Sequence, residues 1–325
     1  MKIRIPFKKE ESSNESWRNI AKRSIAVIGY RGAGKTTFIG LLAVHIDYLA
    51  SSDIGIKLRF IPGVNNFPYH SWGYILTAIR GGQPLSPTEV TKAPYLGRLV
   101  VKYPKLLGEG ELNIPIIDLA GELYQPIMGF IFDSKSQDFD YEKWNERLKQ
   151  RLESLGVTKN DLQLIYDFIF KAKAYLILIN LEHALSSISA SLKNSESNNY
   201  DDIKSLLERY FHIVTNLVNY RIERKDPPHV GIVLTHYDKV SDYIEGKLGY
   251  YVFDNYNDRI KLINYIESTI LNELKNLREN VPIFISYYKQ PLRPNEADDE
   301  VGVRLPNYPK QEYNKIFEWI KEALK

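Results

Sequence analysis

The chain of 325 residues contains no cysteine and only two methionines. Without cysteine it cannot form disulfides, iron–sulfur clusters or zinc sites built on thiolates. Its six histidines are scattered, and no two of them have the spacing typical of metal ligands. The sequence therefore carries no signature of a thiolate-bound or histidine-bound metal.

Long apolar runs and strong charge are also lacking. No run approaches the roughly 18–20 residues that a membrane span needs, and residues 1–6 lack the apolar core of a signal peptide. The net charge of +3 is small, and the basic residues do not cluster with aromatic ones, which argues against a nucleic-acid surface. Hydrophobic residues make up 44% of the chain, enough for a substantial core. We therefore expect a globular cytoplasmic protein with neither a membrane span nor a nucleic-acid partner.

One glycine-rich run, called the phosphate loop below, fits the P-loop pattern at every fixed position. It consists of Gly29, Tyr30, Arg31, Gly32, Ala33, Gly34, Lys35 and Thr36. It follows an apolar run at 25–28 and opens into a helical pattern, which is the context that the motif requires. The glycines let backbone N–H groups turn inward, and the helix N-terminus adds partial positive charge. The alternative is a glycine-rich strand-to-helix turn with an unrelated lysine.

The phosphate loop predicts the roles of three neighbouring side chains. Lys35 would reach the β- and γ-phosphates of a nucleotide, and the Thr36 hydroxyl would bind Mg²⁺. Thr37, the next residue, belongs to the same expected nucleotide site.

Strand and helix patterns alternate along most of the chain. Apolar runs predict strands at 25–29, 98–103, 112–118, 174–181, 229–235 and 281–286, and helical patterns occur at 35–50, 201–220, 258–278 and 312–324. The segment 104–111 is too short for a crossover, so the strands on either side of it should form an antiparallel hairpin. We expect an α/β fold with three layers, a mostly parallel sheet and one antiparallel hairpin strand.

The domain prediction is a polar N-terminal arm at 1–22 and one P-loop domain at 23–325, with insertions at about 51–96 and 122–173. The first insertion contains a predicted strand at 56–61 and a predicted helix at 69–80. The second contains two helical patterns, at 138–155 and from 158 onward, which either pack on the domain as a helical pair or form a module for a protein partner. The polar stretches 191–202 and 291–309 are predicted surface loops.

A second motif lies at the end of the predicted hairpin. Asp118 ends a strand and is followed by Gly121 and Glu122, which matches the D-x-x-G pattern. Asp118 would orient a water on Mg²⁺, and the Gly121 N–H would sense the γ-phosphate. A strand-ending aspartate before a turn glycine is also a common structural feature.

A third motif follows the predicted strand at 229–235. Thr235 and Asp238 have the spacing of the base-reading [N/T]-K-x-D pattern, in which the aspartate accepts hydrogen bonds from guanine N1 and N2. His236 replaces the usual lysine and could stack on a purine, with Lys239 beside it. Asp238 could instead cap the following segment. Ser286, at the end of the last predicted strand, occupies the position of a further base contact.

These segments, in this order, resemble the translation-factor-like class of P-loop GTPases over residues 24–288. The runs 82–88 and 118–122 are similar to a pattern in prokaryotic double-GTPase families. The resemblance implies GTP and GDP as ligands and Mg²⁺ as cofactor. It also implies a switch threonine, either Thr88 or Thr91, that would complete the Mg²⁺ shell.

Hydrolysis would depend on Lys35, Glu122 and Arg31. Glu122 stands where Ras-like proteins carry a glutamine, and it could act as a base or point into solvent. Arg31 could supply positive charge in cis or remain solvated. We expect a Mg²⁺-dependent guanine-nucleotide switch with slow hydrolysis. An ATPase or phosphotransferase and a non-hydrolysing nucleotide-binding scaffold are the alternatives.

The expected partner is an unidentified protein that contacts the switch stretches 82–96 and 121–135 or the helical insertion. A dimer that depends on nucleotide is a further expectation.

Overall fold

The computed structural model describes residues 21–30, 32–52, 55–62, 70–81, 95–104, 109–118, 146–154, 159–186, 198–266, 281–289 and 307–324. The N-terminal arm predicted at 1–22 lies almost entirely outside these ranges. None of the helices in the described part of the chain is long and apolar enough to cross a membrane.

The centre of the molecule is a parallel sheet of four strands. These are β1 (Ile25–Ile28), β5 (Ala174–Asn180), β6 (His229–Thr235) and β7 (Ile283–Ile285), in the order β1-β5-β6-β7. Every pair is parallel, and every residue of β5 is buried. A continuous apolar run of this kind is typical of a strand covered on both faces. The α/β class predicted from the sequence is therefore confirmed.

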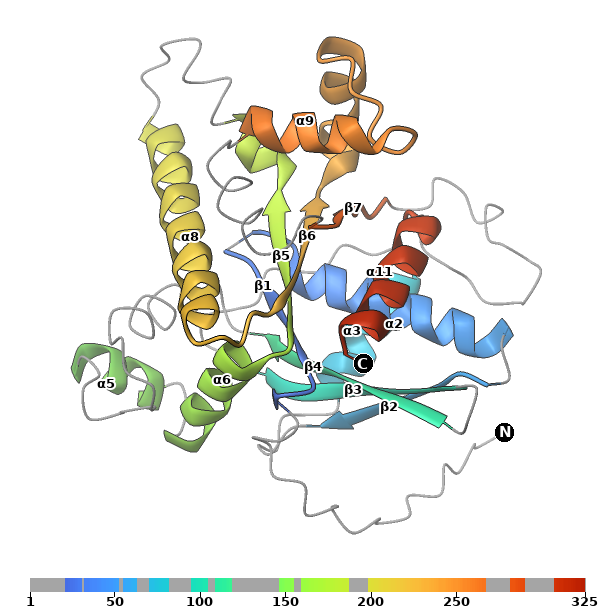
Figure 1. Ribbon diagram of the computed structural model, residues 1–325, viewed down its shortest axis with the longest axis vertical. Coiled ribbons are helices and arrows are strands. Elements are labelled where there is room, and N and C mark those ends of the chain that lie inside the picture. The colour runs from blue at the N-terminus through green and yellow to red at the C-terminus, as the bar shows by residue number, and fades with distance from the viewer. Residues whose placement is uncertain are drawn as a thin grey trace.

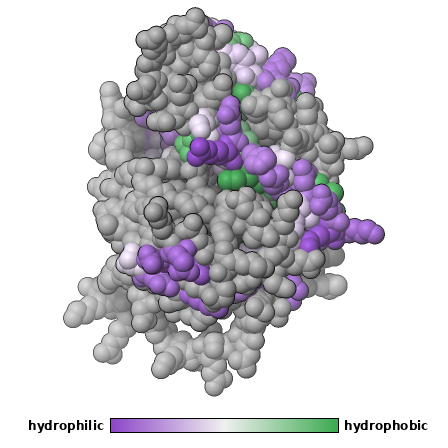
Figure 2. Space-filling model, turned by 90° about the vertical axis from the view of Figure 1, so that its left-hand side faces the viewer, coloured by the Kyte–Doolittle hydropathy of each residue, from purple (hydrophilic) through white to green (hydrophobic). Residues whose placement is uncertain are grey.

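Helices cover both faces of this sheet (Figure 1). On one side lies α8 (Asn198–Glu223), and on the other lie α2 (Lys35–Ser52) and α11 (Lys310–Ala323). Apolar residues Tyr210, Val214 and Leu217 of α8 are buried, whereas His212 and Asn216 between them are exposed. Figure 2 shows this side of the molecule, where the coloured residues are mainly hydrophilic. The burial pattern of α8 is that of a helix with an apolar stripe against the sheet.

A second, antiparallel sheet has the order β2-β3-β4. Its strands are β2 (Lys57–Pro62), β3 (Tyr95–Pro104) and β4 (Glu109–Asp118). The predicted hairpin is confirmed as β3 and β4. The expectation of one sheet with a single antiparallel hairpin strand is not met, because the hairpin pairs with β2 along the whole length of β2. The two sheets nevertheless touch, since β4 contacts β1.

The remaining helices are α3 (His70–Arg80), α5 (Glu146–Ser154), α6 (Lys159–Lys171) and α9 (Tyr256–Ile266), with the short elements η2 (Tyr237–Lys239) and η3 (Asp242–Lys247). The helices predicted at 35–50, 69–80, 201–220 and 312–324 are all present, and α9 covers the described part of the one predicted at 258–278. Helix α6 begins next to the predicted cap, and it contacts β1. An insertion whose helices pack on the domain must make a contact of this kind.

Two loop predictions were wrong at their ends. Helix α8 begins at Asn198, inside the predicted loop 191–202, because asparagine and aspartate favour helix N-termini as much as loops. Tyr308, at the end of the predicted surface loop 291–309, is buried against the rings of His45 and Tyr313.

Candidate functional site

The phosphate loop connects the end of β1 to the start of α2, as the motif predicts. Gly32 and Gly34 have φ values of +78° and +80°, a conformation that favours glycine. Both glycines lie against imidazole rings. A Cβ on Gly32 would be 2.8 Å from Cε1 of His183, and one on Gly34 would be 3.1 Å from Cε1 of His236. Larger residues would therefore strain the backbone and displace the two histidines.

Lys35 is buried in the phosphate loop, with only 7% of its surface exposed. Its Nζ donates hydrogen bonds to the carbonyl oxygens of Gly29 at 2.8 Å and Tyr30 at 3.1 Å. The ammonium group is thus held inside the loop. Because Lys35 is the first residue of α2, its charge adds to the positive end of the helix dipole.

Side chains from two neighbouring strands hold the phosphate loop from outside. Thr235, at the end of β6, donates its hydroxyl to the Ala33 carbonyl oxygen at 2.9 Å. Asn180, at the end of β5, donates from Nδ2 to the Gly32 carbonyl oxygen at 2.8 Å. The strand register places these two residues opposite each other at the same sheet edge. The carboxyl edge of a parallel sheet is where ligands bind in α/β folds.

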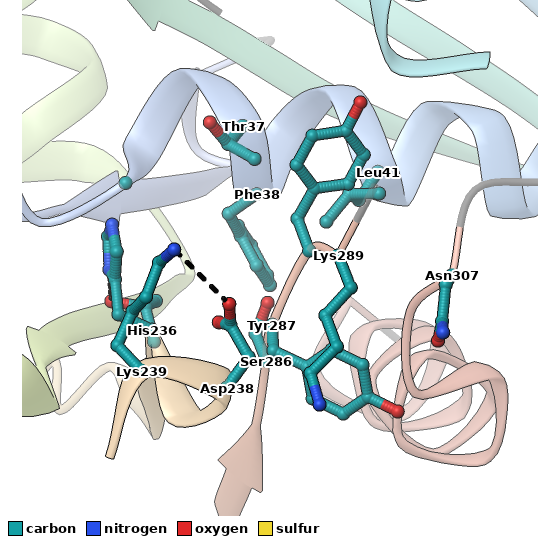
Figure 3. Close-up of a pocket in the computed structure, with 13 residues that line it drawn as sticks. Thr37, Phe38, Leu41, His236, Asp238, Lys239, Ser286, Tyr287, Lys289 and Asn307 are labelled. Atoms are coloured by element: carbon teal, nitrogen blue, oxygen red, sulfur yellow. Dashed lines mark hydrogen bonds and ion pairs between the residues drawn. The ribbon is translucent and has the colours of Figure 1, made fainter. Parts of the chain in front are cut away.

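A cavity of about 610 Å³ begins at Gly34 and extends along α2 (Figure 3). Its walls come from α2, from the end of β6 with η2, from the segment after β7, and from Asn307. The lining residues are Gly34, Thr37, Phe38, Leu41, Thr235, His236, Asp238, Lys239, Ser286, Tyr287, Tyr288, Lys289 and Asn307. The structure therefore brings together the residues predicted from the first and third motifs.

Asp238 lies half-buried in this cavity. Burial raises the pKa of the carboxyl group, and the charge of the nearby Lys239 opposes that shift. Lys239 Nζ is 3.9 Å from Asp238 Oδ2, an ion pair that Figure 3 marks with a dashed line. An ionised carboxylate in a concave site accepts hydrogen bonds from ligand N–H groups.

His236 connects the phosphate loop to the cavity. Its backbone is left-handed, with φ 59° and ψ 29°, which is uncommon for a residue other than glycine. This turn places its ring against Gly34, and its Nδ1 is 3.1 Å from the Thr235 hydroxyl oxygen. Burial lowers the pKa of His236, so the imidazole is neutral at neutral pH.

Ser286 lines the cavity, but its own polar groups are engaged in the fold. Its hydroxyl is 2.8 Å from the Tyr313 hydroxyl, and its N–H donates to the Leu234 carbonyl oxygen at 2.8 Å. The next two residues, Tyr287 and Tyr288, place half-buried rings at the cavity instead. Aromatic faces of this kind can stack on a flat ligand.

Sequence reasoning missed several residues of this site: Phe38, Leu41, Asn180, His183, Tyr287, Tyr288, Lys289 and Asn307. Most of them lie at or just after the ends of β5 and β7, or on the first turns of α2. The signal that could have found them is their position just beyond the end of a parallel strand, where ligands bind in α/β folds. Asn307 is the exception, since it reaches the cavity only through its antiparallel bridge with Lys289.

Other predicted residues cannot be placed in this site. Arg31, Thr88, Thr91, Gly121 and Glu122 lie outside the described residues, and Asp118 is described only as the last residue of β4. Of the predicted Mg²⁺ ligands, Thr36 stands in the first turn of α2, as the motif requires. Within the described ranges, no cluster of three or more His, Asp or Glu side chains is arranged to hold a metal ion. Of the groups expected to hold the metal, the described part of the chain supplies the Thr36 hydroxyl at the start of α2.

Comparison of the sequence with protein-family models and with curated proteins found no match. The resemblance to P-loop GTPases therefore rests on the sequence motifs.

Proposed function

We propose that this protein is a guanine-nucleotide-binding switch that uses Mg²⁺ and hydrolyses GTP slowly. The observation that supports it most is that the phosphate loop, with its buried Lys35, opens directly into the cavity that contains Asp238. One end of this continuous site favours anions and the other accepts hydrogen bonds. A nucleotide has the complementary groups at its two ends.

The phosphate end is supported by the charge and backbone of the loop. The Lys35 ammonium and the N-terminus of α2 both favour an anion between them. Thr235 holds the Ala33 carbonyl oxygen toward β6. Because C=O and N–H point in opposite directions across a trans peptide, the Gly34 N–H faces away from Thr235. That N–H is then available to a phosphate oxygen.

The base end is supported by the position of Asp238. Guanine presents two adjacent N–H donors to one carboxylate, whereas adenine presents no such edge. His236 and Tyr287 border the same cavity and offer flat surfaces to a purine. These features favour GTP over ATP.

The metal and hydrolysis steps are supported by the sequence motifs. Mg²⁺ would be held by Thr36 with Thr88, and by Asp118 through water, and it would neutralise phosphate charge. Glu122 would orient the attacking water and Arg31 would compensate charge. We expect slow hydrolysis because a carboxylate beside a phosphate is repelled unless it is protonated or bridged by water.

Calorimetry with GTP and ATP, each with and without Mg²⁺, tests the proposal. We expect GTP to bind more tightly than ATP, and Mg²⁺ to strengthen the binding. Asp238→Asn should weaken GTP at least about tenfold and favour xanthosine triphosphate, because the amide can donate to the xanthine carbonyl. Asp242→Asn, an exposed change on η3, is the matched control and should leave GTP affinity unchanged.

Each alternative function predicts a different result. Equal affinity for ATP and GTP would indicate an ATPase or phosphotransferase. Tight GTP binding without any turnover would indicate a non-hydrolysing scaffold. Absence of nucleotide binding would overturn the proposal.

A further inference from the structure

We propose that Asn180 is the positioning residue of the phosphate loop, an inference that rests on the proposed nucleotide binding. Asn180 is the last residue of β5, and only 2% of its surface is exposed. It would act by holding residues 30–33 in the shape that binds phosphate, without touching the nucleotide.

The hydrogen bonds of Asn180 determine how its amide is oriented. The His183 N–H donates to Oδ1 at 3.2 Å, and Nδ2 donates to the Gly32 carbonyl oxygen at 2.8 Å. Oδ1 cannot donate, so the amide can satisfy both partners in this orientation only. A carboxylate at this position would keep the first bond and would place a negative oxygen against the Gly32 carbonyl.

Asn180 also holds the other end of the same turn. Its main-chain N–H donates to the Tyr30 hydroxyl at 3.2 Å, and that hydroxyl is 3.4 Å from the Asn180 carbonyl oxygen. Within the turn, the Ala33 N–H donates to the Tyr30 carbonyl oxygen at 3.1 Å and closes the turn. One residue of β5 therefore contacts both the first and the third residue of the turn 30–33.

The turn and Thr235 together determine the direction of the following backbone. Asn180 holds the Gly32 carbonyl oxygen, and Thr235 holds that of Ala33. Two successive peptide planes are thus fastened to two neighbouring strands of a buried sheet. Loss of the Asn180 bond should let the first plane rotate, and a loop with more conformations binds its ligand less tightly.

The test compares Asn180→Asp, Asn180→Ala and the wild type for binding of GDP and a non-hydrolysable GTP analogue with Mg²⁺. At pH 7.5 we expect Asn180→Asp to bind at least about tenfold more weakly, because one hydrogen bond is lost and a repulsion is added. Asn180→Ala should bind about fivefold more weakly, since it only loses the bond.

Lowering the pH separates positioning from a general structural role. Burial should raise the pKa of the introduced carboxyl group, so at pH 5.5 a protonated Asp could donate to the Gly32 carbonyl oxygen. The affinity difference between wild type and Asn180→Asp should therefore shrink at pH 5.5, whereas that of Asn180→Ala should stay constant. His183 and His236 can titrate in all three proteins, and Asn180→Ala, which adds no charge, measures their contribution to the pH dependence.

Tyr175→Phe is the matched control. It removes two buried hydrogen bonds from the same strand, far from the phosphate loop: the Tyr175 hydroxyl donates to the Ile169 carbonyl oxygen and accepts from Arg221 Nη1 at 3.1 Å. Unfolding by denaturant is measured for each protein, and Tyr175→Phe should lose stability but not nucleotide affinity. If Asn180→Asp does not fold, the comparison of Asn180→Ala with Tyr175→Phe decides the question.

Three results would overturn the inference. The first is a folded Asn180→Asp protein that binds within twofold of the wild type at pH 7.5. The second is unchanged affinity of a folded Asn180→Ala protein, and the third is a loss of affinity in Tyr175→Phe equal to that in Asn180→Ala. A wild type that binds no nucleotide would refute the proposed function itself, which is a separate outcome.

Discussion

At the scale of single residues, the phosphate loop depends on one buried charge. The Lys35 ammonium contacts two carbonyl oxygens of its own loop, and these partial charges hold it in place. Each hydrogen bond from a charged donor contributes about 1.5–3 kcal/mol. Removal of this side chain should affect the ligand and the loop together.

We predict that Lys35→Ala abolishes measurable GTP binding while the protein remains folded. The variant loses the ammonium that would contact two phosphate groups, at a cost of about 1.5–3 kcal/mol for each bond. Calorimetry measures the affinity, and circular dichroism checks the fold. Lys57→Ala, which removes an exposed lysine from β2, should bind as the wild type does. Unchanged affinity in a folded Lys35→Ala protein would show that the nucleotide does not bind at the phosphate loop.

At the scale of elements, a buried histidine joins α2 to α11. Nδ1 of His45 is 2.7 Å from the Tyr308 hydroxyl, and Nε2 is 2.8 Å from Asn314 Oδ1. A neutral ring protonated on Nε2 satisfies both partners, because it accepts from Tyr308 and donates to Asn314. Burial lowers the pKa of His45 to about 4.

We predict that this histidine makes the protein less stable in weak acid. Above the unfolded pKa of about 6.5 the ring is neutral in both states, and its contribution is fully present. As the pH falls from 6.5 to 4, only the unfolded state takes up the proton, and stability falls by on the order of 3 kcal/mol. Urea unfolding at several pH values should show that stability decreases less in His45→Gln than in the wild type. His212→Gln, an exposed change on α8, should follow the wild type. A decrease of equal size in the wild type and His45→Gln would contradict this assignment.

A second link between elements is the ion pair of Arg259 on α9 and Glu312 on α11. Both side chains are buried, and two hydrogen bonds of 2.8 Å and 2.9 Å connect them. Glu312 also accepts from the N–H of Ile285 on β7 at 3.1 Å. Burial alone would raise the pKa of Glu312, but the hydrogen bonds from Arg259 and Lys315 lower it below its usual value. The pair therefore positions the strand that leads into the cavity wall.

We predict that Glu312→Gln destabilises the protein by about 3–5 kcal/mol, because it leaves the Arg259 charge buried without its counter-charge. The free energy of unfolding in urea measures this loss. Glu318→Gln, on the same helix with an exposed carboxylate, should change stability little. Similar small losses in both variants would mean that the buried pair contributes no more than a surface pair.

At the scale of the whole molecule, the candidate site joins segments that are far apart in the sequence. Its walls come from α2, β6 with η2, β7 and Asn307, which span residues 34–307. A ligand that contacts all of them binds the folded state and has no equivalent site in the unfolded chain. Such binding stabilises the entire fold by mass action.

We predict that GTP with Mg²⁺ raises the thermal unfolding midpoint by several degrees. At a free nucleotide concentration of a hundred times Kd, the stabilisation is about 2.7 kcal/mol. Differential scanning fluorimetry measures the shift, which should be smaller with ATP and absent in Lys35→Ala. An unchanged midpoint at saturating GTP would contradict binding to the folded state.

The sequence alone was sufficient for the features that consecutive residues determine. The phosphate loop between β1 and α2, the hairpin of β3 and β4, and the alternation of strands and helices could all be predicted. In each case the signal is local, because backbone conformation follows from glycine positions, turn length and apolar periodicity. The position of Asp238 near the loop also followed from its motif.

Only the tertiary structure decided which distant residues meet. The register of β5 against β6 places Asn180 opposite Thr235, and both reach the phosphate loop. The separate antiparallel sheet and the inward hydroxyl of Ser286 likewise depend on partners elsewhere in the chain. Local pattern carries no information on the register of the parallel sheet, since its neighbouring strands are joined by segments of tens of residues or more. The contacts that shape the site were therefore determined by how the sheet assembles.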